Sequence, residues 1–115
     1  MTSNKDQIKL IDKWIAALSS GKYQKCRGVL KVTGENGDCK FCALGVFADI
    51  LGYEFDENGD MIDSEYDLCG YSVFQKHIPS LDFDNVWWVN DRIDDYGRDY
   101  FNVIKYLEKH KQTLL

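Results

Sequence analysis

The stretch Cys42–Leu51, which reads CALGVFADIL, decides the fold. It is apolar almost throughout, and Asp49 is its only charged residue. A surface helix carries a polar face, whereas a helix that is apolar on all sides has to be buried. We therefore expect a central helix over residues 42–51, ended by Gly52, with the rest of the chain packed around it.

The residues on either side of this helix predict two β-hairpins. Residues 27–33, RGVLKVT, are β-branched and partly alternating, which is typical of a strand. Asn36 and Gly37 then supply the positive φ angles of a tight turn, and residues 38–41 return as the second strand. The tetrapeptide ENGD of residues 35–38 recurs at 57–60, which predicts a second hairpin between residues 53–55 and 61–63. A calcium loop over residues 56–60 is disfavoured because Gly59 is in the wrong register.

Helices are predicted toward both ends of the chain. Ser3 and Asp6 form a helix start, and apolar residues at helical spacing follow to residue 19. A second helix is expected over residues 100–111, with Phe101, Ile104 and Leu107 on one face. Between them we expect a short helix over 73–78, an apolar run over 86–89 that is either strand or helix, and a polar loop over 90–97. The whole chain, residues 1–115, is predicted to be one α+β domain in which two hairpins and the terminal helices pack on the central helix.

Composition and charge exclude several classes of protein. Hydrophobic residues make up 44% of the 115 residues, which is too many for a disordered chain. No apolar run is long enough for a membrane span or a signal peptide, so we expect a cytoplasmic protein that binds no membrane. Residues 54–99 carry a net charge of −10, which disfavours nucleic-acid binding and suits either a solvated surface or a basic partner.

The four cysteines, Cys26, Cys39, Cys42 and Cys69, leave three interpretations open. Cys39 and Cys42 form a C-x-x-C pair, which is typical of zinc or redox sites. Cys26 and Cys69 stand alone, so the match to a four-cysteine zinc site is poor. Free cysteine is also a common core residue. We favour packing and expect neither a metal nor a cofactor.

One set of residues predicts a cysteine enzyme, as an alternative function. Cys42 stands where a strand ends and a helix begins, and a helix N-terminus lowers the pKa of a thiol. A nucleophile also needs a base within hydrogen-bond reach. His77 is the candidate base, oriented by Asn90 or Asp91. The more ordinary interpretation is that Cys42 is a small core residue.

A second set predicts a ligand site formed by Arg27, Trp87, Asn90 and Asp91. Asn90 and Asp91 follow a bulky apolar run and are placed to project into a pocket, although a capping turn explains them as well. Lys22, Lys25 and Arg27 form a basic loop that suits a phosphate or a carboxylate, unless it is simply solvated. The aromatic residues that could stack on a planar ligand, or else belong to the core, are Trp87, Trp88, Tyr96, Tyr100 and Phe101.

Several short motifs along the chain resemble a known family. They are WIAALSSGKY at residues 14–23, RGVL at 27–30, CALGV at 42–46 and WVND at 88–91, followed by the C-terminal helix. This series is similar to a family of small uncharacterised proteins of bacteriophages and bacteria. The chain departs from the family pattern at Cys39, where an apolar residue is usual, and in the acidic insert around residues 54–70.

The resemblance implies no particular reaction, but it suggests a phage or prophage origin. Small phage proteins often bind and block a host factor, such as a defence protein, or sequester a small molecule. Together with the weak catalytic set, this leads us to expect a non-enzymatic binding protein. Its partner would be a host protein or a small anionic or nucleotide-like ligand.

Overall fold

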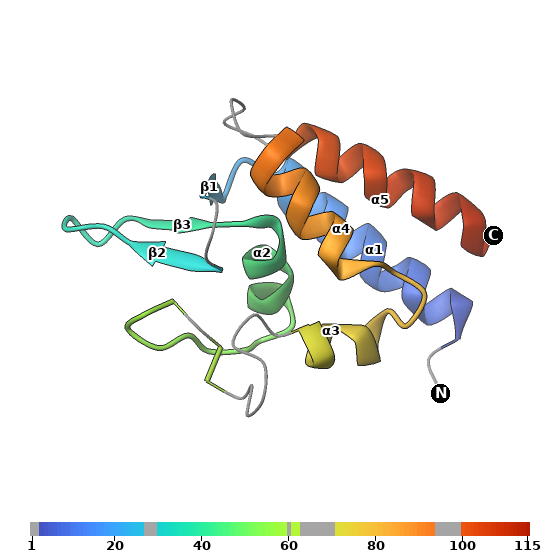
Figure 1. Ribbon diagram of the computed structural model, residues 1–115, viewed down its shortest axis with the longest axis horizontal. Helices are drawn as coiled ribbons and strands as arrows, with labels where there is room; N and C mark the ends of the chain where they lie inside the picture. Colours follow the sequence, from blue (N-terminus) through green and yellow to red (C-terminus); the bar gives the residue numbers. More distant parts are fainter. Residues whose placement is uncertain (1–2, 27–29, 60, 63–70, 94–99) are drawn as a thin grey trace.

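The computed structural model places the elements in two groups around α2 (Figure 1). The structure describes residues 3–26, 30–59, 61–62, 71–93 and 100–115. A small sheet lies on one side of α2 (Ala43–Ile50), and the helices α1 (Asn4–Ser19), α4 (Phe83–Trp88) and α5 (Phe101–Leu114) lie on the other. This is an α+β domain, as the sequence predicts. Its radius of gyration is 13.4 Å, a value typical of a folded chain of this length.

The helix α1 matches its prediction at both ends. Ser3 is the N-cap, and its Oγ accepts a hydrogen bond of 3.1 Å from the backbone N–H of Asp6. Ile11, Trp14 and Leu18 form the buried face, and Gly21 reverses the chain with φ of +78°. The α1 helix thereby presents one apolar face to α2 and α5.

The sheet has three strands in the order β1-β3-β2. The predicted first hairpin is present as β2 (Lys31–Thr33) and β3 (Cys39–Phe41), which are antiparallel. Its turn differs from the one expected: Gly37 has φ of +82°, but Asn36 does not have a positive φ. The hairpin closes through a longer loop, in which the N–H of Gly37 donates to the carbonyl of Gly34. Residues 27–29, the start of the predicted strand, lie outside the described residues.

The strand β1 (Gln24–Lys25) was not predicted from the sequence. It pairs in parallel with β3, with Lys25 opposite Phe41. This pairing brings the residues that follow α1 beside the start of α2. It therefore sets the position of both sites described below.

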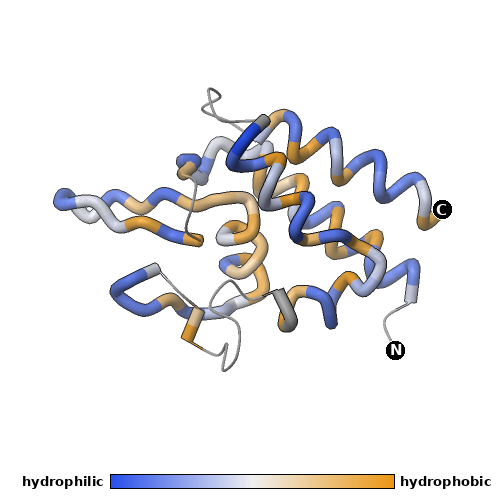
Figure 2. The backbone as a smooth tube through the Cα atoms, viewed as in Figure 1, coloured by the Kyte–Doolittle hydropathy of each residue, from blue (hydrophilic) through white to orange (hydrophobic). Residues whose placement is uncertain are grey.

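The helix α2 is buried on nearly all sides, as its composition requires. Its residues from Ala43 to Ala48 are all buried, and Figure 2 colours most of this helix as hydrophobic. Trp14 stacks on Phe47 with ring centroids 4.3 Å apart, and its indole N–H donates to the carbonyl of Ala43 at 2.9 Å. Gly45 allows α2 to approach the backbone of Leu30, because a Cβ at this position would lie only 1.9 Å from the Leu30 carbonyl oxygen.

The second predicted hairpin is reduced to a loop closed by one bridge. Phe55 and Met61 form an isolated antiparallel bridge, and Gly59 supplies the positive φ of the turn. The side chain of Asp56 accepts from the N–H of Asn58, which shapes the turn without strands of any length. Asp63 lies outside the described residues.

Two segments in the C-terminal half are helical although the sequence predicts a loop for one and does not decide between strand and helix for the other. The short α3 (Tyr71–His77) agrees with the expected helix before Pro79. The undecided run 86–89 belongs to α4, whose N-cap Asp82 accepts from the N–H of Asn85 at 3.1 Å, and to η1, a π-helix over Val89–Ile93. Residues 90–93 are therefore helical, and the prediction of a polar loop is wrong for them. Residues 94–97 lie outside the described part.

The buried face of α5 is rotated from the one expected. Val103 and Leu107 are fully buried, whereas Phe101 is 58% exposed. The face predicted with Phe101 and Ile104 therefore points partly outward. This rotation leaves the Phe101 ring at the surface beside a pocket.

Candidate functional site

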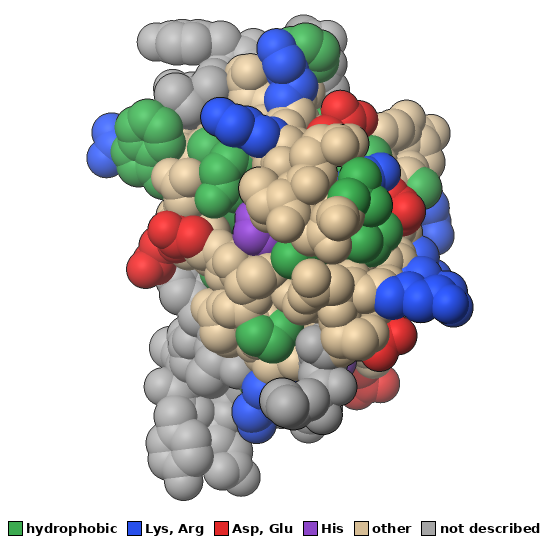
Figure 3. Space-filling view, turned by 90° about the vertical axis from the view of Figure 1, so that its right-hand side faces the viewer, with side chains coloured by type: hydrophobic (Ala, Val, Ile, Leu, Met, Phe, Trp, Pro, Cys, Tyr) green, Lys and Arg blue, Asp and Glu red, His purple; other side chains and the backbone are tan. Residues whose placement is uncertain are grey.

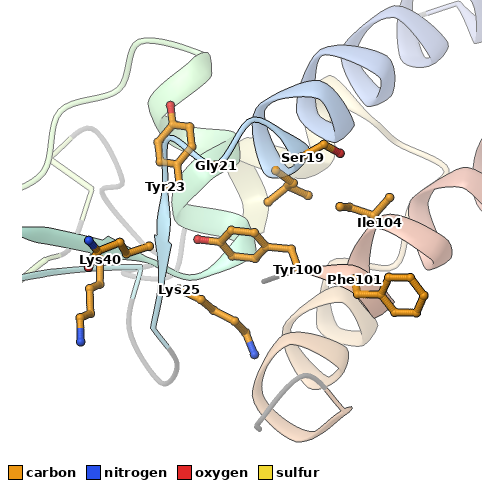
Figure 4. Close-up of a pocket in the computed structure, with 10 residues that line it drawn as sticks. Ser19, Gly21, Tyr23, Lys25, Lys40, Tyr100, Phe101 and Ile104 are labelled. Carbon is orange, nitrogen blue, oxygen red and sulfur yellow. The ribbon is translucent and has the colours of Figure 1, made fainter. Parts of the chain in front are cut away.

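A pocket of about 850 Å³ opens where α1 ends, β1 passes and α5 begins. It falls within the size range of small-molecule sites. The lining residues come from segments far apart in the sequence: Leu18, Ser19, Gly21, Tyr23, Gln24, Lys25, Lys40, Tyr100, Phe101 and Ile104. Figure 4 shows the Tyr100 ring at the centre of this group, between β1 and the first turn of α5.

The aromatic residues divide into a fixed wall and an exposed ring. Tyr100 is 1% exposed, and its hydroxyl donates to the carbonyl of Phe41 at 2.7 Å, so it cannot swing aside. Tyr23 is held from its other end, since its hydroxyl donates to Asp49 at 2.5 Å and its pKa rises to about 12, chiefly through burial. Phe101, by contrast, offers an exposed ring face at the edge of the pocket, and the ammonium of Lys105 lies 5.0 Å from its centroid.

The charge of the pocket is positive. Its charged lining residues within the described part of the chain are Lys25 and Lys40, and none is acidic. Figure 4 shows Lys25 reaching below Tyr100 toward the side of Phe101, while Lys40 extends away from the rings. The dipoles of α1 and α5 oppose each other here, because one helix ends where the other begins. The preference for an anion therefore comes from the lysines.

Of the four residues predicted to bind a ligand, Asn90 has a structural role. It is 1% exposed, and its Oδ1 accepts from the backbone N–H of Ala43 at 3.0 Å. Its Nδ2 donates to the carbonyl of Cys26 at 3.2 Å and to the carboxylate of Asp91 at 2.9 Å. Both amide protons are thus used within the protein. Asn90 therefore accepts from a backbone N–H in the first turn of α2 and joins that turn to Cys26, the residue after β1.

Of the other predicted ligand residues, Trp87 and Asp91 do not line the pocket. Trp87 is half-buried on α4, and Asp91 is held beside Asn90 in η1. Arg27 lies outside the described residues. Members of the basic loop and of the aromatic set do line the pocket: Lys25 lies there with Tyr100 and Phe101. The two features are adjacent only because β1 pairs with β3, and no local sequence signal indicates that pairing.

Cys42 is the N-cap of α2, as expected, but its surroundings do not activate it. The thiol is 1% exposed and accepts a weak bond from the N–H of Gly45 at 3.4 Å. Burial raises its pKa well above the ordinary value, and the charge of Asp91 raises it further. The contacts described for His77 are with Tyr53, 3.4 Å from its Nε2, and with the Phe47 ring. These features favour the structural interpretation of Cys42 over the catalytic one.

The C-x-x-C pair does not form a joint site in this fold. Cys39 and Cys42 are three residues apart along an extended segment, so their side chains leave β3 on opposite faces. The described residues contain no group of three or more potential metal ligands, and Cys69 lies outside them. Cys42 instead stands beside Cys26, which sequence spacing gave no reason to expect.

Comparison with known proteins identifies the family but not its activity. The model of a domain of unknown function (DUF8296) matches residues 4–91, which is most of the chain, and the chain belongs to this family. The match includes α1, the sheet, α2 and Asn90, while α5 lies beyond it. No curated protein and no solved structure matches the chain. Within the described residues, no helix is both long enough and apolar enough to cross a membrane.

Proposed function

We propose that this protein is a non-enzymatic binding protein that holds a small anionic ligand with a planar ring, such as a nucleotide, in the pocket between α1, β1 and α5. The observation that carries the proposal is the meeting of Lys25 with Tyr100 and the exposed ring of Phe101 in a pocket of about 850 Å³. A lysine suits a phosphate or carboxylate, and an exposed ring suits stacking.

The state of the remaining candidate groups supports binding rather than catalysis. Cys42 is buried with a raised pKa, and Asn90 is occupied by backbone contacts. The pocket is lined by rings, two ammonium groups, an amide and a serine. This set recognises a ligand but provides neither a poised nucleophile nor a base beside one.

The resemblance to small bacteriophage and bacterial proteins supports a biological setting for this activity. In a host cytoplasm, a small protein that sequesters an anionic signalling molecule would serve an infecting phage. The alternative partner, a host protein, would meet the acidic segment 54–99. We favour the small ligand because Lys25, Tyr100 and Phe101 line one pocket together.

Isothermal titration with three probes tests the proposal. Adenosine monophosphate carries both the ring and the anion, while adenosine and inorganic phosphate each carry one of them. We expect the nucleotide to bind at least tenfold more tightly than either fragment, because stacking and charge contribute together. Absence of binding by all three probes would count against the pocket as a nucleotide site.

Two variants assign the binding to this pocket. Lys25→Gln removes one charge and Phe101→Ala removes the exposed ring, and each should weaken nucleotide binding by roughly tenfold. Phe101 is 58% exposed, so its loss should leave stability nearly unchanged. Lys13→Gln is the matched control, because Lys13 is exposed on α1 and does not line the pocket. Equal weakening by the control would show nonspecific charge attraction.

A further inference from the structure

The end of β1 and the start of α2 place two thiols that are not in disulfides, those of Cys26 and Cys42, at neighbouring positions. In the parallel pair of β1 and β3, Lys25 lies opposite Phe41. The next position in this register places Cys26 opposite Cys42. The backbone N–H of Cys26 donates to the carbonyl of Phe41 at 3.1 Å, which continues the ladder by one residue.

The parallel register determines how the two side chains are arranged. Neighbouring strands lie roughly 4.8 Å apart, and residues at matching positions project to the same face of a sheet. Cys42 still has extended backbone, with φ of −75° and ψ of 171°. The Cα separation expected for such a pair falls within the range of about 4.4–6.8 Å that disulfides occupy. Cys39 leaves β3 on the opposite face and is not part of this pair.

Two further hydrogen bonds, both made by the side chain of Asn90, hold the two segments together. Asn90 donates to the carbonyl of Cys26 and accepts from the N–H of Ala43, so a single side chain spans both backbones. The hydroxyl of Tyr100 donates to the carbonyl of Phe41, which also accepts from the N–H of Cys26. The thiols are therefore held near each other by the fold itself, before any bond forms between them.

The electrostatics of the pair agree with this placement. Burial, and to a smaller degree the charge of Asp91, raise the pKa of Cys26 to about 11. Burial is the main cause that raises the pKa of the Cys42 thiol, and the charge of Cys26 raises it further. Thiols of high pKa exchange slowly, but the disulfide they form has poor leaving groups and resists reduction.

We propose that Cys26 and Cys42 form an oxidisable dithiol, which low-molecular-weight disulfides such as oxidised glutathione convert to an intramolecular disulfide. The half-buried Cys26 thiolate attacks the small disulfide, whose S–S bond breaks and releases one glutathione. The Cys42 thiolate then attacks the Cys26 sulfur of the mixed disulfide and releases the second. Two protein thiols are oxidised, and one disulfide is reduced to two thiols. The new bond joins the end of β1 to the N-cap of α2.

Oxidation of the whole protein in a glutathione buffer at pH 8, followed by alkylation and mass spectrometry, tests this inference. We expect the oxidised chain to take up two alkyl groups where the reduced chain takes up four, and peptide mapping to show a Cys26–Cys42 link. Trypsin releases Cys26 in a dipeptide, and a second protease that cuts after Glu54 separates Cys42 from Cys69. The crosslinked loop of about 17 residues restricts the unfolded chain, so Tm should rise by roughly 10 °C.

Variants and alternative products decide the outcome. Cys39→Ser is the matched control and should still protect two thiols from alkylation and gain the same Tm, whereas Cys26→Ala should do neither. A link that involves Cys39 or Cys69, a glutathione adduct without an internal disulfide, or no oxidation at all would overturn the inference. Mapping uses the unmodified sequence, so the answer does not depend on whether a variant folds. None of these readouts involves the pocket ligand.

Discussion

Replacing Asn90 by alanine tests the central structural argument, which is that one side chain holds α2 against β1. The substitution removes the acceptor for the Ala43 N–H and the donor to the Cys26 carbonyl. Ala43 is fully buried, so water cannot replace the lost acceptor without opening the core. An unsatisfied buried group costs about 1–3 kcal/mol, and a lost ordinary hydrogen bond costs about 1 kcal/mol.

We therefore expect Asn90→Ala to lower the free energy of unfolding by about 3 kcal/mol. Urea denaturation followed by tryptophan fluorescence measures this loss. With a slope of roughly 1.5 kcal/mol per molar urea, the midpoint should fall by about 2 M. Asn85→Ala is the matched control on α4, because the bond between its backbone N–H and Asp82 survives the change. Its effect should stay within about 0.5 kcal/mol.

A second substitution at Asn90 separates the roles of its two ends. Asn90→Asp keeps an oxygen for the Ala43 N–H but sets a carboxylate against the Cys26 carbonyl and the Asp91 carboxylate. It should destabilise the protein at pH 7 and recover in part in acid, where the protonated carboxyl again donates. A loss below about 1 kcal/mol for Asn90→Ala, or a loss equal to that of Asn85→Ala, would refute the reasoning.

Two further predictions concern packing and pH. Gly45→Ala should lower the free energy of unfolding in urea by at least about 2 kcal/mol, although alanine has the better helix propensity, because its Cβ would lie 1.9 Å from the Leu30 carbonyl oxygen. Gly34→Ala is the control, because the nearest atom to its Cβ would be 3.4 Å away. Equal effects of the two substitutions would contradict the close approach of α2 to Leu30. Burial lowers the pKa of His110, so the unfolded chain binds its proton more readily and stability should fall as the pH drops below about 6.5. His110→Gln should reduce this fall in Tm between pH 7.5 and 5.5, and an unchanged pH dependence would exclude His110 as its source.

The elements predicted correctly are those with a local cause. The Ser3 cap and the apolar spacing after it determine α1, and the nearly continuous apolar stretch after Cys42 determines α2. The apolar run alone does not distinguish helix from strand at residues 86–88. Asp82 is a typical N-cap residue a few positions earlier, and this signal could have predicted the helix. A two-residue strand such as β1, in contrast, has no pattern of its own and exists only through its pairing with β3.

The same limit explains what was missed at the candidate sites. Lys25 and the pair Tyr100 and Phe101 each stood out in the sequence, but their meeting depends on contacts between residues some 75 positions apart. Asn90 stands out in the sequence as a polar residue after an apolar run, which predicts a ligand residue or the cap of a turn. Its capping of a helix 47 residues away could not be seen, because the donor it satisfies is a backbone N–H that any residue would supply.

The shortness of α2 has a consequence for how the protein unfolds. A helix of eight residues is too short to persist alone in water, so it forms only where its surroundings complete it. Those surroundings come from α1 through Trp14, from the residue before β2 through the Leu30 carbonyl, and from η1 through Asn90. Each of these contacts therefore stabilises α2 and the elements packed on it together, and the loss of one weakens the whole domain. The amide protons of α2 should consequently exchange with solvent only when the whole domain opens, while the ends of α1 and α5 fray independently.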